Sequence, residues 1–184
     1  MIDTASKLRS LEEAVTWRSK QQVPVVFTNG VFDLIHAGHV ELLEAARREG
    51  GALIVGVNSD ASARRLGKGT GRPINGESAR ARVIAGFAAV DCTLVFEDDT
   101  PMQLIQSLTP DVLVKGADYQ RNAIVGAEWV EAHGGRVVRV PLIAGFSTTS
   151  IVKPVGTGRS VGRVCKSMPI PGSSPRWVSP SAMR

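Results

Sequence analysis

Two of the three histidines in the sequence lie three residues apart, within the stretch TNGVFDLIHAGH at residues 28–39. His36 and His39 have Gly38 between them, and their spacing lets both imidazole rings face one side of a helix that begins there. A helix N-terminus attracts anions through its free N–H groups and its dipole, and each ring can donate a hydrogen bond to a phosphate oxygen. The pair therefore favours a phosphate site. The alternatives are zinc binding and burial of a ring in the core, although zinc helices space their histidines at i, i+4 and no third ligand is obvious.

A second candidate phosphate element is the hydroxyl-rich segment STTS at residues 147–150, which precedes the apolar pair Ile151 and Val152. Hydroxyls in front of an apolar pair are an N-cap signal, so the segment predicts another helix start. Such a start can offer N–H and O–H donors to a phosphate. For this segment alone, an ordinary helix cap remains the simpler alternative.

Charged residues elsewhere could complete an anion site. Lys68 lies among glycines and could place its charge over a polyphosphate, and Arg72 and Arg80 are similar candidates. Lys115 follows an apolar run, which puts it at the end of a predicted strand. Each of these residues, taken singly, also fits a solvated surface charge. The carboxylates that could orient a hydroxyl or a magnesium-bound water are Asp33 and Asp118.

The hydrophobic pattern predicts alternating strands and helices. Buried strands are expected at residues 23–28, 53–57, 93–96, 111–114 and 136–140, and helices at about 11–20, 38–48, 77–89, 100–108 and 124–133, with a loop over 61–76. This alternation predicts βαβ units, and hence an α/β fold with a Rossmann-like parallel sheet and helices on both faces. Ligands of such sheets bind beyond the carboxyl ends of the strands. The polar residues expected there are Thr28, Asn29 and Gly30, Asn58 and Asp60, Lys115 and Gly116, and residues 147–150.

Local signals predict two helix starts and one core-facing stripe. The segment SLEE at residues 10–13 is a capping box. Thr100 and Pro101 predict an N-cap followed by proline at the first helical position. On the helix over 38–48, the residues expected to face the core are Val40, Leu42, Leu43 and Ala46.

Length and composition exclude several classes of protein. The chain has 184 residues, of which 43% are hydrophobic, and this fits one globular domain with a core of normal size. No apolar run approaches the roughly 20 residues of a membrane span, and the first residues lack the layout of a signal peptide. Cys92 and Cys165 are too few for a disulfide framework or a CxxC metal site. The composition therefore predicts a cytoplasmic protein without a membrane partner.

The formal net charge of +5 lies in the last segment of the chain. Residues 154–184 contain five basic residues and no acidic one, and removing those five from the 22 basic residues leaves 17, the number of acidic residues. Residues 1–153 are therefore neutral overall, which argues against a nucleic-acid partner. Residues 154–184 are rich in Pro, Gly, Ser and Arg without periodicity, and this composition predicts a disordered tail.

Together these residues resemble the nucleotidyltransferase superfamily that is marked by His-x-Gly-His and a late Ser/Thr-rich helix start. Within it, the chain is similar to the heptose 1-phosphate adenylyltransferases, the adenylyltransferase domain of ADP-heptose synthases. The similarity runs in family order over about residues 6–153. The matching segments are residues 27–40 (FTNGVFDLIHAGHV), 57–61 (VNSDA), 72–75 (RPIN), 89–91 (AVD), 97–101 (EDDTP), 114–119 (VKGADY) and 147–151 (STTSI).

The resemblance implies transfer of AMP from ATP to D-glycero-β-D-manno-heptose 1-phosphate, giving ADP-heptose and pyrophosphate for lipopolysaccharide core synthesis. It implies Mg²⁺ bound with ATP, and it allows a homodimer. The catalytic residues it implies are His36, His39 and Lys68. The residues it places at ATP are Thr28, Asn29, Gly30, Phe32, Gly38, Lys115, Gly116, Asp118, Tyr119, Ser147, Thr148, Thr149 and Ser150. The residues it places at the sugar phosphate are Asp33, Asn58, Asp60, Arg72 and Arg80.

The resemblance also sets the expected domains and the alternatives. We expect a helical segment over 1–22, a domain of the His-x-Gly-His nucleotidyltransferase fold over 23–153, and the tail over 154–184. Many relatives carry a fused sugar-kinase domain, whereas this chain resembles the stand-alone form. Relatives also continue a helix that Pro154 is expected to interrupt here. The alternatives are a sister transferase, such as a glycerol-3-phosphate cytidylyltransferase-like enzyme, and a nucleotide-binding protein inactivated by its C-terminal sequence.

Overall fold

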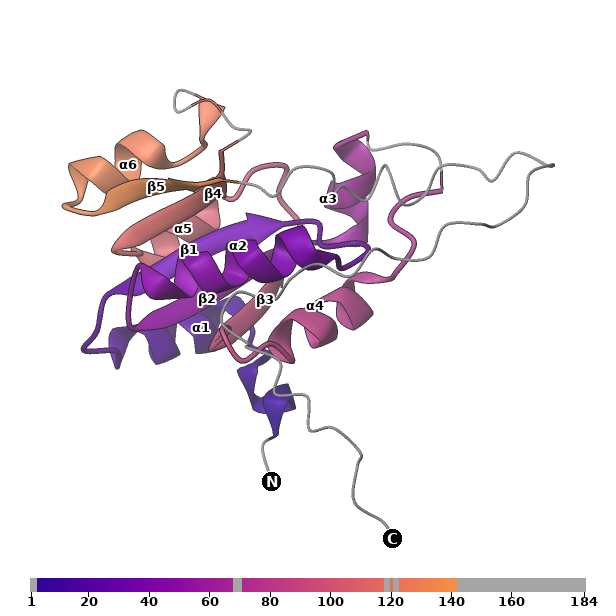
Figure 1. Ribbon diagram of the computed structural model, residues 1–184, viewed down its shortest axis with the longest axis horizontal. Coiled ribbons are helices and arrows are strands. Elements are labelled where there is room, and N and C mark those ends of the chain that lie inside the picture. The colour runs from indigo at the N-terminus through magenta and orange to yellow at the C-terminus, as the bar shows by residue number, and fades with distance from the viewer. Residues whose placement is uncertain (1–2, 68–70, 118–119, 121–122, 142–184) are drawn as a thin grey trace, which may run out of the picture. The chain divides into compact units, whose positions relative to one another are not determined.

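A computed structural model describes residues 3–67, 71–117, 120 and 123–141. The strands form one five-stranded sheet, which is covered by helices (Figure 1). The strand order is β3-β2-β1-β4-β5. All four neighbouring pairs are parallel. The strands are β1 (Val25–Gly30), β2 (Ala52–Asn58), β3 (Cys92–Phe96), β4 (Val112–Gly116) and β5 (Arg136–Val140). The predicted Rossmann-like parallel sheet is confirmed.

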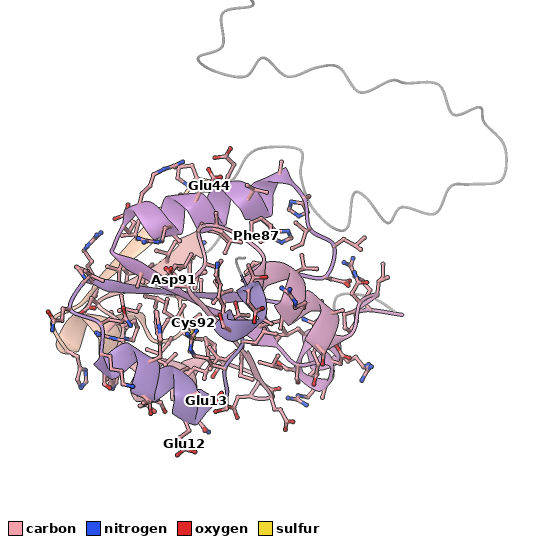
Figure 2. The ribbon with its side chains drawn as sticks, turned by 90° about the horizontal axis from the view of Figure 1, so that it is seen from below. Glu12, Glu13, Glu44, Phe87, Asp91 and Cys92 are labelled. Atoms are coloured by element: carbon pink, nitrogen blue, oxygen red, sulfur yellow. The ribbon has the colours of Figure 1, made fainter. Side chains whose placement is uncertain are left out.

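Helices cover both faces of the sheet, also as predicted. Their bounds are η1 (Thr4–Lys7, a 3₁₀ turn), α1 (Leu11–Ser19), α2 (Ala37–Arg48), α3 (Asp60–Arg65), α4 (Glu77–Ala85), α5 (Met102–Leu108) and α6 (Ala127–Ala132). Residues of α1, α5 and α6 pack in one apolar cluster, and residues of α2 and α4 pack in the other. Figure 2 shows α2, with Glu44, and α1, with Glu12 and Glu13, on opposite sides of the sheet.

The central strand β1 is buried on both faces. Val25 and Phe27 belong to the α1 side of the core, whereas Val26 belongs to the α2 side, and all three are fully buried. Every residue of β2 is buried as well. A strand covered by helices on both sides reads as a continuous apolar run, which is why the sequence identified these strands.

The α2 helix turns a narrower stripe to the core than predicted. Leu43 and Ala46 are fully buried, as expected. Val40 and Leu42 are only half-buried, and Leu42 packs at the margin of the α2-side cluster. Because 3.6 residues make one turn, a stripe centred on residues 43 and 46 leaves 40 and 42 at its edges.

The strands β1, β2 and β4 end one or two residues further along the chain than predicted, whereas β3 and β5 end where predicted. Thr28, Asn29 and Gly30 pair with Val55, Gly56 and Val57, so they belong to β1 and do not follow it. Lys115 and Gly116 likewise pair with Arg139 and Val140 of β5, so they belong to β4. The backbone of polar residues extends both ladders, because main-chain pairing does not require an apolar side chain.

One helix was missed and others are shorter than predicted. The expected loop over 61–76 contains most of α3, which Ser59 caps by accepting a hydrogen bond from the backbone N–H of Ser62 at 3.0 Å. Helix α4 ends at Ala85, with Gly86 as its C-cap, and α6 begins only after Gly126. None of the helices in the described part of the chain is long and apolar enough to cross a membrane.

The two predicted helix starts have opposite outcomes. The capping box of α1 is confirmed: Ser10 Oγ accepts from Glu13 N at 3.1 Å, and Glu13 Oε2 accepts from Ser10 N at 2.8 Å. The prediction for α5 was wrong, because the helix begins at Met102 and Pro101 occupies the N-cap position. The backbone of Pro101, with φ −78° and ψ 13°, is not yet helical.

The capping box predicts a measurable stability change. Replacing Ser10 by alanine removes one of the two reciprocal bonds and should lower the free energy of unfolding by about 1 kcal/mol. Urea denaturation of the folded protein measures the change. Ser78→Ala, at an exposed position inside α4, is the matched control and should have little effect. An equal loss in both variants would show that the capping bonds contribute nothing.

Candidate phosphate-binding site

The candidate site lies at the carboxyl edge of the sheet, where β1 separates β2 from β4. The chain runs from β1 to β2 on one side and returns through β3 to β4 on the other, so the two neighbours of β1 define a topological switch point. Lys115 at the end of β4 donates from Nζ to the Oδ1 of Asn29 at the end of β1. The lysine is only 9% exposed. A cationic side chain is therefore held between the two strand ends at which ligands of this architecture bind.

Both histidines stand at the start of α2, where the sequence placed them. His36 is the N-cap residue, with an extended backbone and no side-chain capping bond, and His39 lies in the first turn. Their rings stack with centroids 3.9 Å apart and planes inclined by 23°. The two imidazoles thus share one side of the helix start, next to the positive end of its dipole.

Both histidines are half-buried, so they are neither core residues nor fully exposed to solvent. Burial lowers the pKa of His36 below its usual 6.5, because desolvation disfavours the imidazolium. A neutral ring at pH 7 has one N–H donor and one acceptor. His36 can therefore donate a hydrogen bond to a phosphate oxygen without carrying a charge.

The loop between β1 and α2 has an unusual backbone. Phe32 has φ +49°, in the left-handed region that non-glycine residues rarely occupy. The residue is 4% exposed, and its ring lies 5.3 Å from the ring of His39, centroid to centroid. A Cβ at Gly30 would come within 3.2 Å of the Phe32 ring, so a glycine at this position lets the ring fold back over the end of β1.

Asp33, a predicted sugar-phosphate ligand, is occupied by contacts within the protein. Its Oδ1 accepts the backbone N–H groups of Ile74 at 2.8 Å and Asn75 at 3.1 Å. Its Oδ2 accepts from Arg72 Nε at 3.0 Å and forms an ion pair with Arg72 Nη2 at 2.9 Å. The carboxylate therefore fastens residues 72–75, called the strap below, to the β1–α2 loop.

Arg80, Asp60 and Asn58 are also engaged internally. The Arg80 side chain is fully buried and pairs through Nη2 with Asp60 Oδ1 at 2.7 Å. The backbone N–H of Asp60 donates to Glu77 Oε2 at 2.6 Å. Asn58 is buried and donates from Nδ2 to Ser62 Oγ at 2.9 Å. Among the predicted sugar-phosphate residues, the structure thus pairs Asp33 with Arg72 and Asp60 with Arg80, whereas Asn58 bonds to Ser62.

Thr28 is fully buried, and its hydroxyl has no hydrogen-bond partner among the described residues. A ligand approaching β1 would meet Asn29 and Gly30 first, because both are half-exposed. The assignment of Thr28 to the ATP site therefore stays a prediction.

Several predicted site residues lie outside the described residues. They are Lys68, Asp118, Tyr119, Ser147, Thr148, Thr149 and Ser150, and the tail over 154–184 lies outside as well. Within residues 3–67, 71–117, 120 and 123–141, no group of three or more His, Cys, Asp or Glu side chains could hold a metal ion.

Sequence reasoning missed two residues of the network, Asn75 and Glu77. Asn75 Nδ2 donates to the carbonyl of Asp33 at 3.0 Å, and Glu77 fixes the first residue of α3. The available signal for Asn75 was the segment RPIN at residues 72–75, which is one of the segments that resemble the heptose 1-phosphate adenylyltransferases. The partner of Glu77 is 17 residues away, beyond the reach of local patterns.

The fold defines an α/β protein of the Rossmann-like class, and two stacked imidazole rings lie at the start of the helix that follows its central strand. The chain belongs to the cytidylyltransferase-like family, whose model matches residues 27–153. The match includes both histidines of the pair and all five strands, apart from the first two residues of β1.

Curated relatives are about half identical to this chain. The bifunctional protein HldE of Mesorhizobium japonicum is 50% identical over 158 residues, which are 86% of this chain and 31% of the relative. The bifunctional protein HldE of Hyphomonas neptunium is 52% identical over 143 residues, which are 78% of this chain and 29% of the relative. The chain thus spans about three-tenths of the length of these relatives.

Two solved structures resemble the fold. The lipopolysaccharide core biosynthesis protein of Thermoplasma volcanium GSS1 superposes with a TM-score of 0.56 at 27% identity, over 66% of this chain and 97% of that one. The pantoate–β-alanine ligase of Francisella tularensis superposes with a TM-score of 0.54 at 15% identity, over 73% of this chain and 66% of that one. At such low identity the second likeness shows the fold alone.

The lowered pKa of His36 predicts a pH dependence of stability. The unfolded chain binds a proton near pH 6.5, whereas the folded protein binds it only at lower pH. As the pH falls below 6.5, the unfolded state therefore gains protons first and the protein loses stability. As the pH falls from about 7.5 to the lowered pKa, the free energy of unfolding of the wild type should decrease relative to that of His36→Gln. Urea titrations of both proteins at several pH values measure this difference, and a constant difference would contradict the prediction.

Proposed function

We propose that the chain is an adenylyltransferase that transfers AMP from ATP to D-glycero-β-D-manno-heptose 1-phosphate, giving ADP-heptose and pyrophosphate. The observation that carries the proposal is the identity of about 50% with HldE proteins over most of the chain. It is supported by the sequence segments that resemble ADP-heptose synthases. A structural relative at 27% identity is named a lipopolysaccharide core biosynthesis protein, which fits the same use of the product.

The proposed reaction is a direct displacement at the α-phosphorus of ATP. A phosphate oxygen of the sugar attacks, the bond from the α-phosphorus to the oxygen bridging to the β-phosphate breaks, and pyrophosphate leaves with the electron pair. No covalent enzyme intermediate forms. Catalysis then consists of positioning two anions and stabilising the charge that develops on the phosphate oxygens.

The described residues can supply these two effects. His36 and His39 would donate N–H groups to the phosphates, beside the backbone N–H groups at the start of α2. Asn29, Gly30 and Lys115 lie at the strand ends where the α-phosphate would approach. We keep Lys68, Asp118, Tyr119 and Ser147 to Ser150 as predicted ligands of the reactants.

Magnesium would enter with ATP. The described residues offer no three-ligand group, and Mg²⁺ is commonly held by substrate phosphates, water and one or two carboxylates. The site therefore fits a metal that ATP carries, and the metal would supply charge neutralisation on the phosphates. A reaction that uses ATP also fits the expected cytoplasmic location.

One alternative has specific support. The family is described as cytidylyltransferase-like, so CTP is a credible donor and an alcohol phosphate such as glycerol 3-phosphate a credible acceptor. Pyrophosphate release should be measured with ATP and CTP, each combined with heptose 1-phosphate and glycerol 3-phosphate. We expect release only with ATP and heptose 1-phosphate. Turnover with CTP and glycerol 3-phosphate instead, or ATP binding without any turnover, would overturn the proposal.

The histidine roles predict a large kinetic effect with little structural effect. His36→Ala and His39→Ala should each lower kcat by about 10²–10³-fold, the usual effect of removing one stabilising donor. Glu44→Ala, at an exposed position on the same helix, is the control and should retain activity. Thermal melting must accompany the kinetics. A large fall in Tm with little change in kcat would favour the core alternative for the rings.

A further inference from the structure

Arg80 is a buried charge with partners in three separate segments. Its side chain is fully buried within α4. Nη2 donates to Asp60 at the start of α3, Nε donates to the carbonyl of Asn75 in the strap at 2.9 Å, and Nη1 donates to the carbonyl of Val31 in the β1–α2 loop. A buried guanidinium is tolerated only when its donors are satisfied, and here each nitrogen has an acceptor.

The partner in the β1–α2 loop adjoins the left-handed residue Phe32. A non-glycine residue in this region is strained, and it persists only where its surroundings hold it. On one side of Phe32, Arg80 holds the carbonyl of Val31. On the other side, the carboxylate of Asp33 is held by the strap, whose Asn75 carbonyl Arg80 also binds. Arg80 therefore contacts the supports on both sides of the strained residue.

The backbone of Phe32 in turn sets the position of the histidines. The Phe32 ring lies against the ring of His39, which stacks on the ring of His36. Rotation of Phe32 out of the left-handed region would withdraw its ring from His39. The contacts thus run without a break from Arg80, through the loop backbone, to the two rings.

We propose that Arg80 is a positioning residue that holds the β1–α2 loop, and through Phe32 the two imidazole rings, in the geometry required for phosphate transfer. The sequence-based expectation places Arg80 at the sugar phosphate, whereas in the structure its side chain has no exposed surface and each of its nitrogens donates to a protein acceptor. An arginine is required because its planar fork reaches three acceptors in different directions, which the single ammonium of lysine cannot do.

The test begins with the protein free of ligand. In Arg80→Lys, the ring ¹⁵N and ¹H signals of His36 and His39 should shift, because the environment and tautomer of the rings change with the loop. Arg82→Lys is the matched control, since Arg82 lies on the same helix, is exposed, and bonds only to Thr4 Oγ1 among the described side chains. Its histidine signals should match those of the wild type.

Kinetics supply the second measurement, and this part rests on the proposed function. Arg80→Lys should lower kcat by about 10–100-fold and change KM for ATP and for the sugar phosphate by less than about threefold, because misplaced catalytic groups impair the transition state more than binding. Unchanged histidine signals would overturn the proposal, even if Tm falls. A tenfold rise in KM for the sugar phosphate with kcat intact would also overturn it, since it would indicate direct contact.

A second variant covers the case in which Arg80→Lys does not fold. Asp60→Asn keeps Arg80 and removes the charge of one partner, whose side chain is 26% exposed and therefore tolerates replacement more easily. Its histidine signals should shift in the same direction as expected for Arg80→Lys, and unchanged signals would refute the positioning role. Because the spectra need no substrate, they remain decisive if the acceptor proves to be a different phosphate.

Discussion

The pairing of β1 on both of its edges is the constraint on which the rest of the structure depends. Its residues lie in register with β2 on one side and with β4 on the other, and its first four residues are fully buried. A strand held by two ladders and two layers of helices cannot shift along its axis without breaking both. The end of β1 is therefore a fixed point, and the β1–α2 loop, the start of α2 and the end of β4 are all placed relative to it.

Around that fixed point, charges serve mainly to join segments of the chain. Asp33 with Arg72 and Asp60 with Arg80 link a loop, the strap and two helix starts that are distant in sequence. Buried ion pairs add little net stability in general, but removing one partner leaves an uncompensated charge. Such pairs are thus suited to fixing one arrangement of loops among several of similar energy.

The fold was largely predictable because its signals are local. The apolar runs that became β1 and β2, the capping box at Ser10, and the histidines at the start of α2 each lie within a few residues of the feature they specify. Helix α3 was missed because its six residues carry no apolar stripe, and only Ser62 and Ala63 are buried. The strand ends were misplaced because Asn29 and Lys115 pair through backbone groups that every residue possesses.

The roles of the charged residues could not be derived in the same way. Arg80 reaches Val31 across 49 residues, and Asp33 reaches Asn75 across 42, so only the folded chain reveals their partners. Those partners also determine the electrostatics of the site. Arginines that are paired with carboxylates contribute little net field at the rim, and burial favours the neutral form of His36 by lowering its pKa. In the function that we propose, attraction for phosphate depends on oriented N–H groups at the start of α2, together with Lys115. Such donors stabilise a phosphate only when they point at its oxygens. A site of this kind is sensitive to small rotations of the β1–α2 loop, and for that reason the buried contacts behind the loop belong to its function.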